Sequence, residues 1–246
     1  MSSDDLLLGG LILLAALLYA SVGHGGASGY LAAMALVGVV PEVMKPTALA
    51  LNVVVALVAT IKFHRAGAFS WPVFWPFALG AIPMAYLGGS LTLPGAIYKP
   101  LVGVVLIFAA WRSLRTAAQA SYELAALPPM ALRLGIGAAL GLLSGLTGVG
   151  GGIFLSPLLM IFRWAPLRTI SGIASTFILA NSIAGLLGLF TRSPQFPSAL
   201  PWWALAALIG GYVGAEYGSR RLGNPVIARL LALVLGIAGV KMLLAV

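Results

Sequence analysis

The sequence predicts an all-α integral membrane protein made of two inverted-topology repeats with five hydrophobic segments each. Of its 246 residues, 61% are hydrophobic and 8% are charged, which is more apolar surface than a water-soluble core buries. Apolar runs close to the length of a membrane-spanning helix recur along the chain, whereas the short alternating strands of a barrel do not. Glycines and prolines also recur at a fixed spacing in the two halves.

Ten apolar segments divide evenly between the halves. We expect them at 6–22, 27–40, 46–63, 72–92, 97–114, 131–147, 150–163, 169–190, 200–219 and 225–245. A polar stretch, 116–129, separates the fifth segment from the sixth. The sequence therefore predicts a first membrane repeat over 1–115, a cytoplasmic linker over 116–129 and a second membrane repeat over 130–246.

Backbone-shaping residues coincide when the first half is shifted onto the second. The pairs, each separated by 125 positions, are Gly10 and Gly135, Gly23 and Gly148, Gly25 and Gly150, Gly26 and Gly151, Pro41 and Pro166, Pro72 and Pro197, Pro76 and Pro201, and Gly89 and Gly214. Because glycine and proline fix backbone shape, this coincidence indicates an internal duplication. Each half has an odd number of segments, so the two copies enter the membrane from opposite sides, as in many secondary transporters.

The basic residues predict the orientation of the chain. With the N-terminus outside, ten of the fourteen lysines and arginines fall on the cytoplasmic side, and four fall outside: Lys45, Lys99, Arg192 and Lys241. This bias favours a multi-pass protein of the inner membrane with the 116–129 linker in the cytoplasm. The count is the same for ten spans and for eight spans plus two re-entrant hairpins, so we expect eight to ten transmembrane helices.

Glycine-rich breaks interrupt the apolar sequence at equivalent places in the two halves. The first reads SVGHGGASG and the second reads LTGVGGGIF. The segments after them would extend roughly 21 Å, which is short of a hydrocarbon core of about 30 Å. They are interpreted as half-helices whose N-termini offer free N–H groups and partial positive charge to an anion near the midplane. The alternative is that these glycines only permit close helix packing.

Candidate substrate-binding residues come from the two breaks and from polar positions inside apolar segments. They are Gly23, His24, Gly25, Gly26, Asn52, Gly148, Gly150, Gly151, Gly152, Ser175, Thr176 and Asn181. Unpaired amides are costly in lipid, so the polar side chains should face the bundle interior, where they either join helices or bind substrate. We expect Asn52 to face the first break, and Asn181 to face the second.

His24 and Glu216 are the candidates for proton coupling. The chain has only two histidines, and His24 lies in the first break, where it is placed to titrate. Its alternative is a neutral histidine that is hydrogen-bonded to a carbonyl. Glu216 precedes Arg220 by four residues, which predicts a structural i, i+4 ion pair as the alternative to a proton relay.

Four stretches carry a resemblance to a known family. They are GVGGGIFLSPLL (148–159), GHGGASGYLAAM (23–34), KFHRAGAFSW (62–71) and ILANSIAGLL (178–187). With these the chain resembles the TauE/SafE sulfite exporter family, also called the 4-toluene sulfonate uptake permease family. The resemblance implies transport of sulfur-containing oxyanions such as sulfite or organosulfonates. The first-half stretch departs from the second at Ala32, opposite Pro157, and at His24, opposite Val149, which leaves the substrate open.

Two other function classes are weighed against a secondary transporter. An anion channel uses the same kind of site, so the sequence does not separate it from a carrier. An intramembrane lipid-phosphate enzyme needs clustered acids, histidines or an activated nucleophile, and the chain has five acidic residues and no carboxylate pair. We therefore expect no enzyme.

Composition also bounds the partners. With no cysteine and no cluster of metal-binding residues, the sequence predicts neither a metal site nor a cofactor. The basic residues behind the net charge of +9 lie mainly in short loops between spans, so we do not expect nucleic acid as a binding partner. The expected partners are a small anionic substrate and the lipid bilayer. The oligomeric state is left open, a homodimer included.

Overall fold

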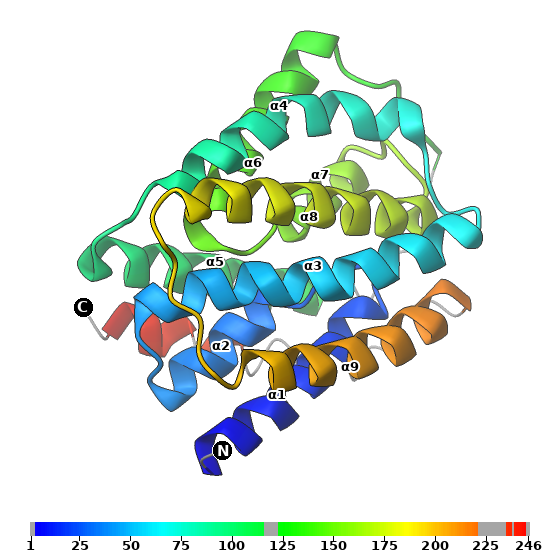
Figure 1. The fold of residues 1–246 in the computed structure, drawn as a ribbon. Helices are drawn as coiled ribbons and strands as arrows, with labels where there is room; N and C mark the ends of the chain where they lie inside the picture. The colour runs from blue at the N-terminus through cyan, green and yellow to red at the C-terminus, as the bar shows by residue number, and fades with distance from the viewer. Residues whose placement is uncertain (1–2, 116–122, 221–234, 238, 245–246) are drawn as a thin grey trace.

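The computed structural model is a helical bundle that describes residues 3–115, 123–220, 235–237 and 239–244. In chain order its helices are α1 (Ser3–Ala20), α2 (Ala27–Val37), α3 (Pro41–Arg65), α4 (Trp71–Ser90), α5 (Gly95–Arg115), α6 (Met130–Thr147), α7 (Gly152–Ile161), α8 (Leu167–Phe190) and α9 (Leu200–Arg220) (Figure 1). The residues described after α9 are also helical, and no strand occurs in the described ranges. The all-α prediction is confirmed. Most of the tenth predicted segment and residues 116–122 of the linker lie outside the described residues.

Length and hydropathy together separate five candidate spans from the other described helices. In the described part of the chain, α1, α3, α4, α6 and α8 are long and apolar enough to cross a membrane. The two helices after the glycine breaks have 11 and 10 residues, so they extend only about 15–17 Å. The prediction of short helices with glycine-led starts is confirmed.

Several helix boundaries differ from the predicted segments, and two of these differences have a clear local cause. Helix α2 ends at Val37 instead of residue 40, because Gly38 takes a left-handed conformation (φ 87°) and its N–H bonds to carbonyls of the last turn. Helix α3 begins at Pro41, five residues before its predicted start, because proline fits the first turn of a helix. Lys45, predicted to lie in a loop, is consequently a buried residue inside α3.

Glycine stripes allow two pairs of helices to pack with their backbones in contact. On α6 a Cβ at Gly141 would lie 2.1 Å from the carbonyl oxygen of Ala81 in α4, and on α9 a Cβ at Gly214 would lie 2.1 Å from that of Leu17 in α1. The i, i+4 spacing places each stripe on one helix face. The stripes are Gly137, Gly141 and Gly145 on α6, and Gly210, Gly214 and Gly218 on α9.

Most of the extensive helix contacts join the two halves of the chain. Helix α1 packs on α9, and α4 packs on α6. Helix α3 contacts α8 and α9, while α8 also contacts α4, so α3 and α8 lie at the centre (Figure 1). The helices of residues 1–115 therefore find much of their packing surface on helices of residues 130–220.

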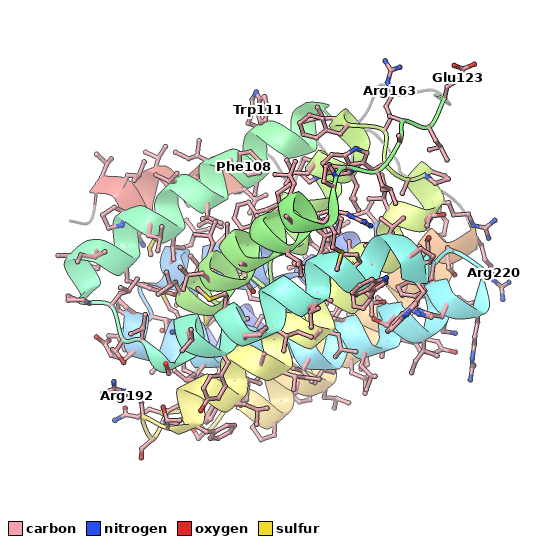
Figure 2. All side chains as sticks on the ribbon, turned by 90° about the horizontal axis from the view of Figure 1, so that it is seen from above. Phe108, Trp111, Glu123, Arg163, Arg192 and Arg220 are labelled. Carbon is pink, nitrogen blue, oxygen red and sulfur yellow. The ribbon has the colours of Figure 1, made fainter. Side chains whose placement is uncertain are left out.

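Charged side chains mark two ends of the bundle. Figure 2 shows Arg163 and Arg220 at one end and Arg192 at the opposite end. Arg192 Nε donates to the carbonyl oxygen of Ser90, at the end of α4. Arg133 Nη1 lies 3.5 Å from the carbonyl oxygen of Pro72, at the start of the same helix. Arg133 and Arg192 therefore contact opposite ends of α4.

Candidate functional site

The two glycine breaks meet at Asn52, which lies midway along α3. Asn52 Oδ1 accepts a hydrogen bond from the N–H of Ala27, the first residue of α2, at 3.1 Å. Asn52 Nδ2 donates to the carbonyl oxygen of Val149, in the second break, at 3.2 Å. The side chain is fully buried. One asparagine therefore joins the start of α2 to the break that precedes α7.

The Asn52 side chain lies so close to the backbone at positions 25 and 150 that only glycine fits there. A Cβ on Gly25 would lie 2.4 Å from Asn52 Oδ1, and one on Gly150 would lie 2.7 Å from Asn52 Nδ2. Both added atoms would also press on Ile178 of α8, as would a Cβ on Gly152. The equivalent glycines of the two breaks thus contact the same two side chains.

The remaining glycines of the breaks shape the backbone. Gly26 and Gly151 are the N-cap residues of α2 and α7, and both take left-handed conformations, with φ of 96° and 78°. Gly23 and Gly148 are left-handed as well, with φ of 78° and 82°. Left-handed backbone is strained for residues with a Cβ, so each break needs glycine at these turns.

The polar residues of α8 divide into two groups. Asn181 faces the second break as predicted, since its Nδ2 lies 3.5 Å from the position that a Cβ on Gly151 would take. Ser175 and Thr176 instead donate to the carbonyl oxygen of Gly172, one turn earlier in their own helix. Asn52 contacts the first break, as predicted, and it also contacts the second break, which was not predicted.

His24 reaches from the first break to the second short helix. Its Nε2 lies 3.3 Å from Ser156 Oγ in α7, and its Nδ1 lies 3.2 Å from the carbonyl oxygen of Val22. The Ser156 hydroxyl donates to the carbonyl oxygen of Gly152 at 2.9 Å. Which of the two ring nitrogens donates depends on the tautomer and protonation of the ring, because a neutral imidazole carries one N–H. The contact with a carbonyl was predicted; the contact with Ser156 was not.

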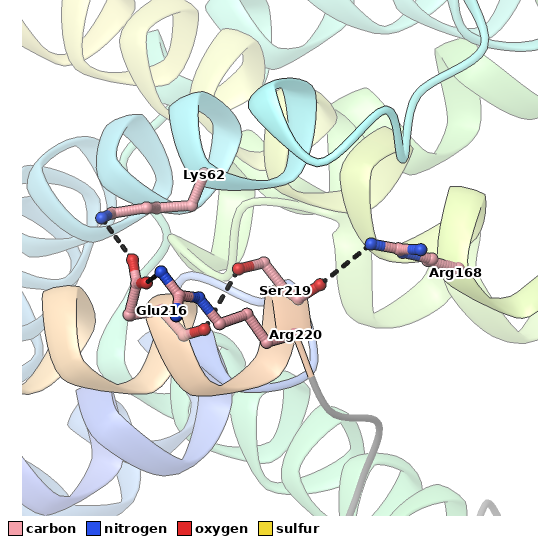
Figure 3. Close-up of polar contacts among 5 residues, drawn as sticks. All are labelled: Lys62, Arg168, Glu216, Ser219 and Arg220. Carbon is pink, nitrogen blue, oxygen red and sulfur yellow. Dashed lines mark hydrogen bonds and ion pairs between the residues drawn. The ribbon is translucent and has the colours of Figure 1, made fainter.

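Glu216 belongs to an ion-pair group where α3 and α9 end (Figure 3). Its carboxylate contacts Arg220 of its own helix, which confirms the predicted i, i+4 pair, and Lys62 of α3, which was not predicted. Lys62 Nζ also lies 4.1 Å from the ring centroid of Tyr212. A carboxylate held between two cations ties α3 to α9, which favours the structural role for Glu216. A role as proton relay stays a prediction.

Two cations cap helix ends at this position and at the opposite end of the bundle. Arg168 Nη2 donates to the carbonyl oxygen of Ser219, in the last turn of α9 (Figure 3). Lys45 Nζ donates to the carbonyl oxygens of Gly88, Gly89 and Leu91 at the end of α4, at 2.9–3.1 Å. The last carbonyls of a helix lack partners and carry partial negative charge, so a cation stabilises them. The Lys45 ammonium is therefore committed to α4.

Comparison with known proteins identifies the family of this bundle. The family described as "Sulfite exporter TauE/SafE" matches residues 8–242, nearly the whole chain. The chain belongs to the TauE/SafE family. This transporter is also 40% identical over 231 residues to the "Probable membrane transporter protein y4hK" of Sinorhizobium fredii (strain NBRC 101917 / NGR234), a match that covers 93% of the chain and 94% of the relative. No solved structure matches it.

The family assignment confirms the resemblance found in the sequence. The protein is a multi-pass membrane transporter of the TauE/SafE family and not an enzyme. Among the described residues, no group of three or more histidines, cysteines, aspartates or glutamates is placed to hold a metal ion. The polar groups between the two breaks include backbone N–H groups, hydroxyls, amides and the His24 imidazole.

Proposed function

We propose that the protein is a secondary transporter that moves small sulfur-containing anions, such as sulfite or organosulfonates, across the inner membrane. The observation that carries this proposal is the meeting of the two glycine breaks at Asn52, which joins the N-terminus of α2 to the break that precedes α7. Each helix N-terminus offers N–H groups and partial positive charge to an anion. The family description as a sulfite exporter supports sulfur oxyanions as the substrate class.

The proposed architecture is a pair of inverted repeats, 1–115 and 130–246, joined by a cytoplasmic linker at 116–129. Helices α2 and α7 begin at Ala27 and Gly152, again 125 positions apart. The pairing of α1 with α9 is matched by that of α6 with α4, as exchange of the repeats requires. The separation of Arg163 and Arg220 from Arg192 supports an outside N-terminus.

The proposed substrate site lies between the breaks. It comprises the break glycines (Gly23, Gly25, Gly26, Gly148, Gly150, Gly151 and Gly152) with His24, Asn52 and Asn181. Ser175 and Thr176 are left out, because their hydroxyls are bonded within α8. In this site His24 would couple protonation to substrate movement through its contact with α7.

Counterflow in proteoliposomes tests the proposed function. Vesicles loaded with unlabelled sulfite, thiosulfate, sulfoacetate, taurine or sulfate are diluted into trace labelled anion at two pH values. A carrier accumulates label transiently above equilibrium with at least one sulfur anion, whereas a channel gives flux without accumulation. The proposal would be contradicted if uptake of each of the five anions were no greater than in protein-free vesicles.

We expect His24→Ala to flatten the pH dependence of transport between about pH 5.5 and 8, the range in which histidine titrates. Protonation of the ring makes Nε2 a hydrogen-bond donor to Ser156, so removal of the ring removes a pH-sensitive contact with α7. His64→Ala is the matched control, since His64 is exposed and bonds to the carbonyl of Thr60 in its own helix. The measurement is the initial counterflow rate across pH. An unchanged profile in His24→Ala would exclude the coupling role.

A further inference from the structure

Three buried polar side chains beside the second break have no hydrogen-bond partner in the described structure. They are Ser144 at the end of α6 and Asn181 and Ser182 of α8, and none of them is exposed. Both the oxygen and the nitrogen of the Asn181 amide are unpartnered. A buried polar group without a partner is energetically costly and rare in proteins. A cluster of three such groups therefore indicates that a bound ligand supplies the missing hydrogen-bond partners.

These side chains converge on the start of α7. A Cβ on Gly150 would lie 3.2 Å from Ser182 Oγ. A Cβ on Gly151 would lie 3.3 Å from Ser144 Cβ and 3.5 Å from Asn181 Nδ2. Gly151 is the N-cap of α7 and supplies no side chain to the free N–H groups of the first turn. The unpartnered donors and the helix N-terminus therefore face the same small region.

The first break differs in that a side chain already accepts a hydrogen bond from the first N–H of its short helix. Asn52 accepts from the N–H of Ala27, the first residue of α2. The Tyr30 hydroxyl donates to the carbonyl oxygen of Gly25 at 2.8 Å. The two breaks have matching backbones but unequal chemistry, because α2 is capped by a side chain and α7 is not.

We propose that the substrate anion binds asymmetrically, with its oxyanion group at the N-terminus of α7, where Ser144, Asn181 and Ser182 donate hydrogen bonds to it. This inference rests on the proposed function and assigns the anion to one of the two helix ends. The serines supply one donor each and the Asn181 amide supplies two. Together with N–H groups of α7, they offer hydrogen-bond donors to the oxygens of an SO₃ group.

The charge of the region narrows the ligand class. The three side chains are neutral, and the nearby Lys45 directs its ammonium to carbonyls at the end of α4. His24, through Ser156, is the ionisable side chain that contacts α7 beyond its first turn. The positive charge at the oxyanion is thus the helix terminus, equivalent to about half an elementary charge. The site therefore suits a singly charged sulfonate better than a doubly charged anion.

Equilibrium binding of labelled methanesulfonate to the purified full-length protein tests the assignment. Ser144→Ala and Ser182→Ala each remove one donor, and Asn181→Asp replaces two donors with acceptors. A hydrogen bond to a charged group contributes enough that we expect affinity to fall about tenfold in each variant. Ser175→Ala is the matched control, being equally buried in α8 but bonded to Gly172. Its affinity should stay within about twofold of wild type.

The outcomes separate this inference from the proposed function. If the wild-type protein binds neither methanesulfonate nor sulfite, the proposed function fails. If the wild type binds but Ser144→Ala, Ser182→Ala and their double variant keep its affinity, the function stands and the asymmetric site is overturned. Melting temperatures are measured for every variant, and the alanine variants, which add neither charge nor volume, decide the result if Asn181→Asp does not fold.

Discussion

Gly150→Ala should abolish transport and destabilise the protein by about 2–5 kcal/mol. Gly150 has a φ of +85°, and left-handed backbone costs a residue with a Cβ roughly 1–2 kcal/mol. The added atom would also lie 2.7 Å from Asn52 Nδ2 and 2.8 Å from Ile178, and overpacking a buried position costs about 1–3 kcal/mol. Because Asn52 joins the two breaks, its displacement should also move the starts of α2 and α7 apart.

Gly135→Ala is the matched control for this substitution. Gly135 lies within α6, and a Cβ there would meet no atom within 4 Å. Alanine is favoured over glycine inside a helix, so stability should be unchanged or slightly raised. Thermal unfolding in detergent and the counterflow rate are the measurements. A Gly150→Ala protein that melts and transports like wild type would show that the breaks do not require this contact.

Asn52→Leu is expected to have a second large effect. It would leave the N–H of Ala27 and the carbonyl of Val149 without their partner. Each buried group left unsatisfied costs about 1–3 kcal/mol, so we expect a loss of about 2–6 kcal/mol. Transport should fall below detection, since the starts of α2 and α7 would lose the link that fixes their separation.

The variant Asn52→Asp separates the contributions that the hydrogen bonds to the two breaks make to stability. The aspartate keeps an acceptor for the N–H of Ala27 but loses the amide donor to Val149. The melting temperature should therefore lie between those of the wild type and Asn52→Leu, as measured in the same detergent. Equal stability of all three proteins would contradict the bridging role of Asn52.

Local pattern predicted the helices and the breaks well. Short apolar segments headed by glycine became α2 and α7, because glycine clusters and the 3.6-residue period act over a few neighbouring residues. The predicted start of α3 at residue 46 was wrong, because Pro41 opens the helix and Pro46 lies inside it. This error also hid the buried Lys45.

The candidate site was predicted only in part. Some of the proposed site residues lie in the first half of the chain and the others lie in the second. The sequence pattern does not show which residues of one half contact those of the other. The bond from Asn52 to Val149 joins residues 97 positions apart, and such a contact is set by packing of whole helices. Ser144 was not predicted, because a serine in an apolar segment usually bonds to its own helix, as Ser175 does.

The pairing of α1 with α9 has a consequence for biogenesis. About 180 residues separate the end of the first helix from the start of the ninth, and ribosomes add roughly 5–20 residues per second. The first helix therefore waits in the lipid for about 10–40 s before its partner is made, with the surface later covered by the α9 glycines facing acyl chains. The contacts between the two halves therefore form only late in synthesis, after most of both halves has been made.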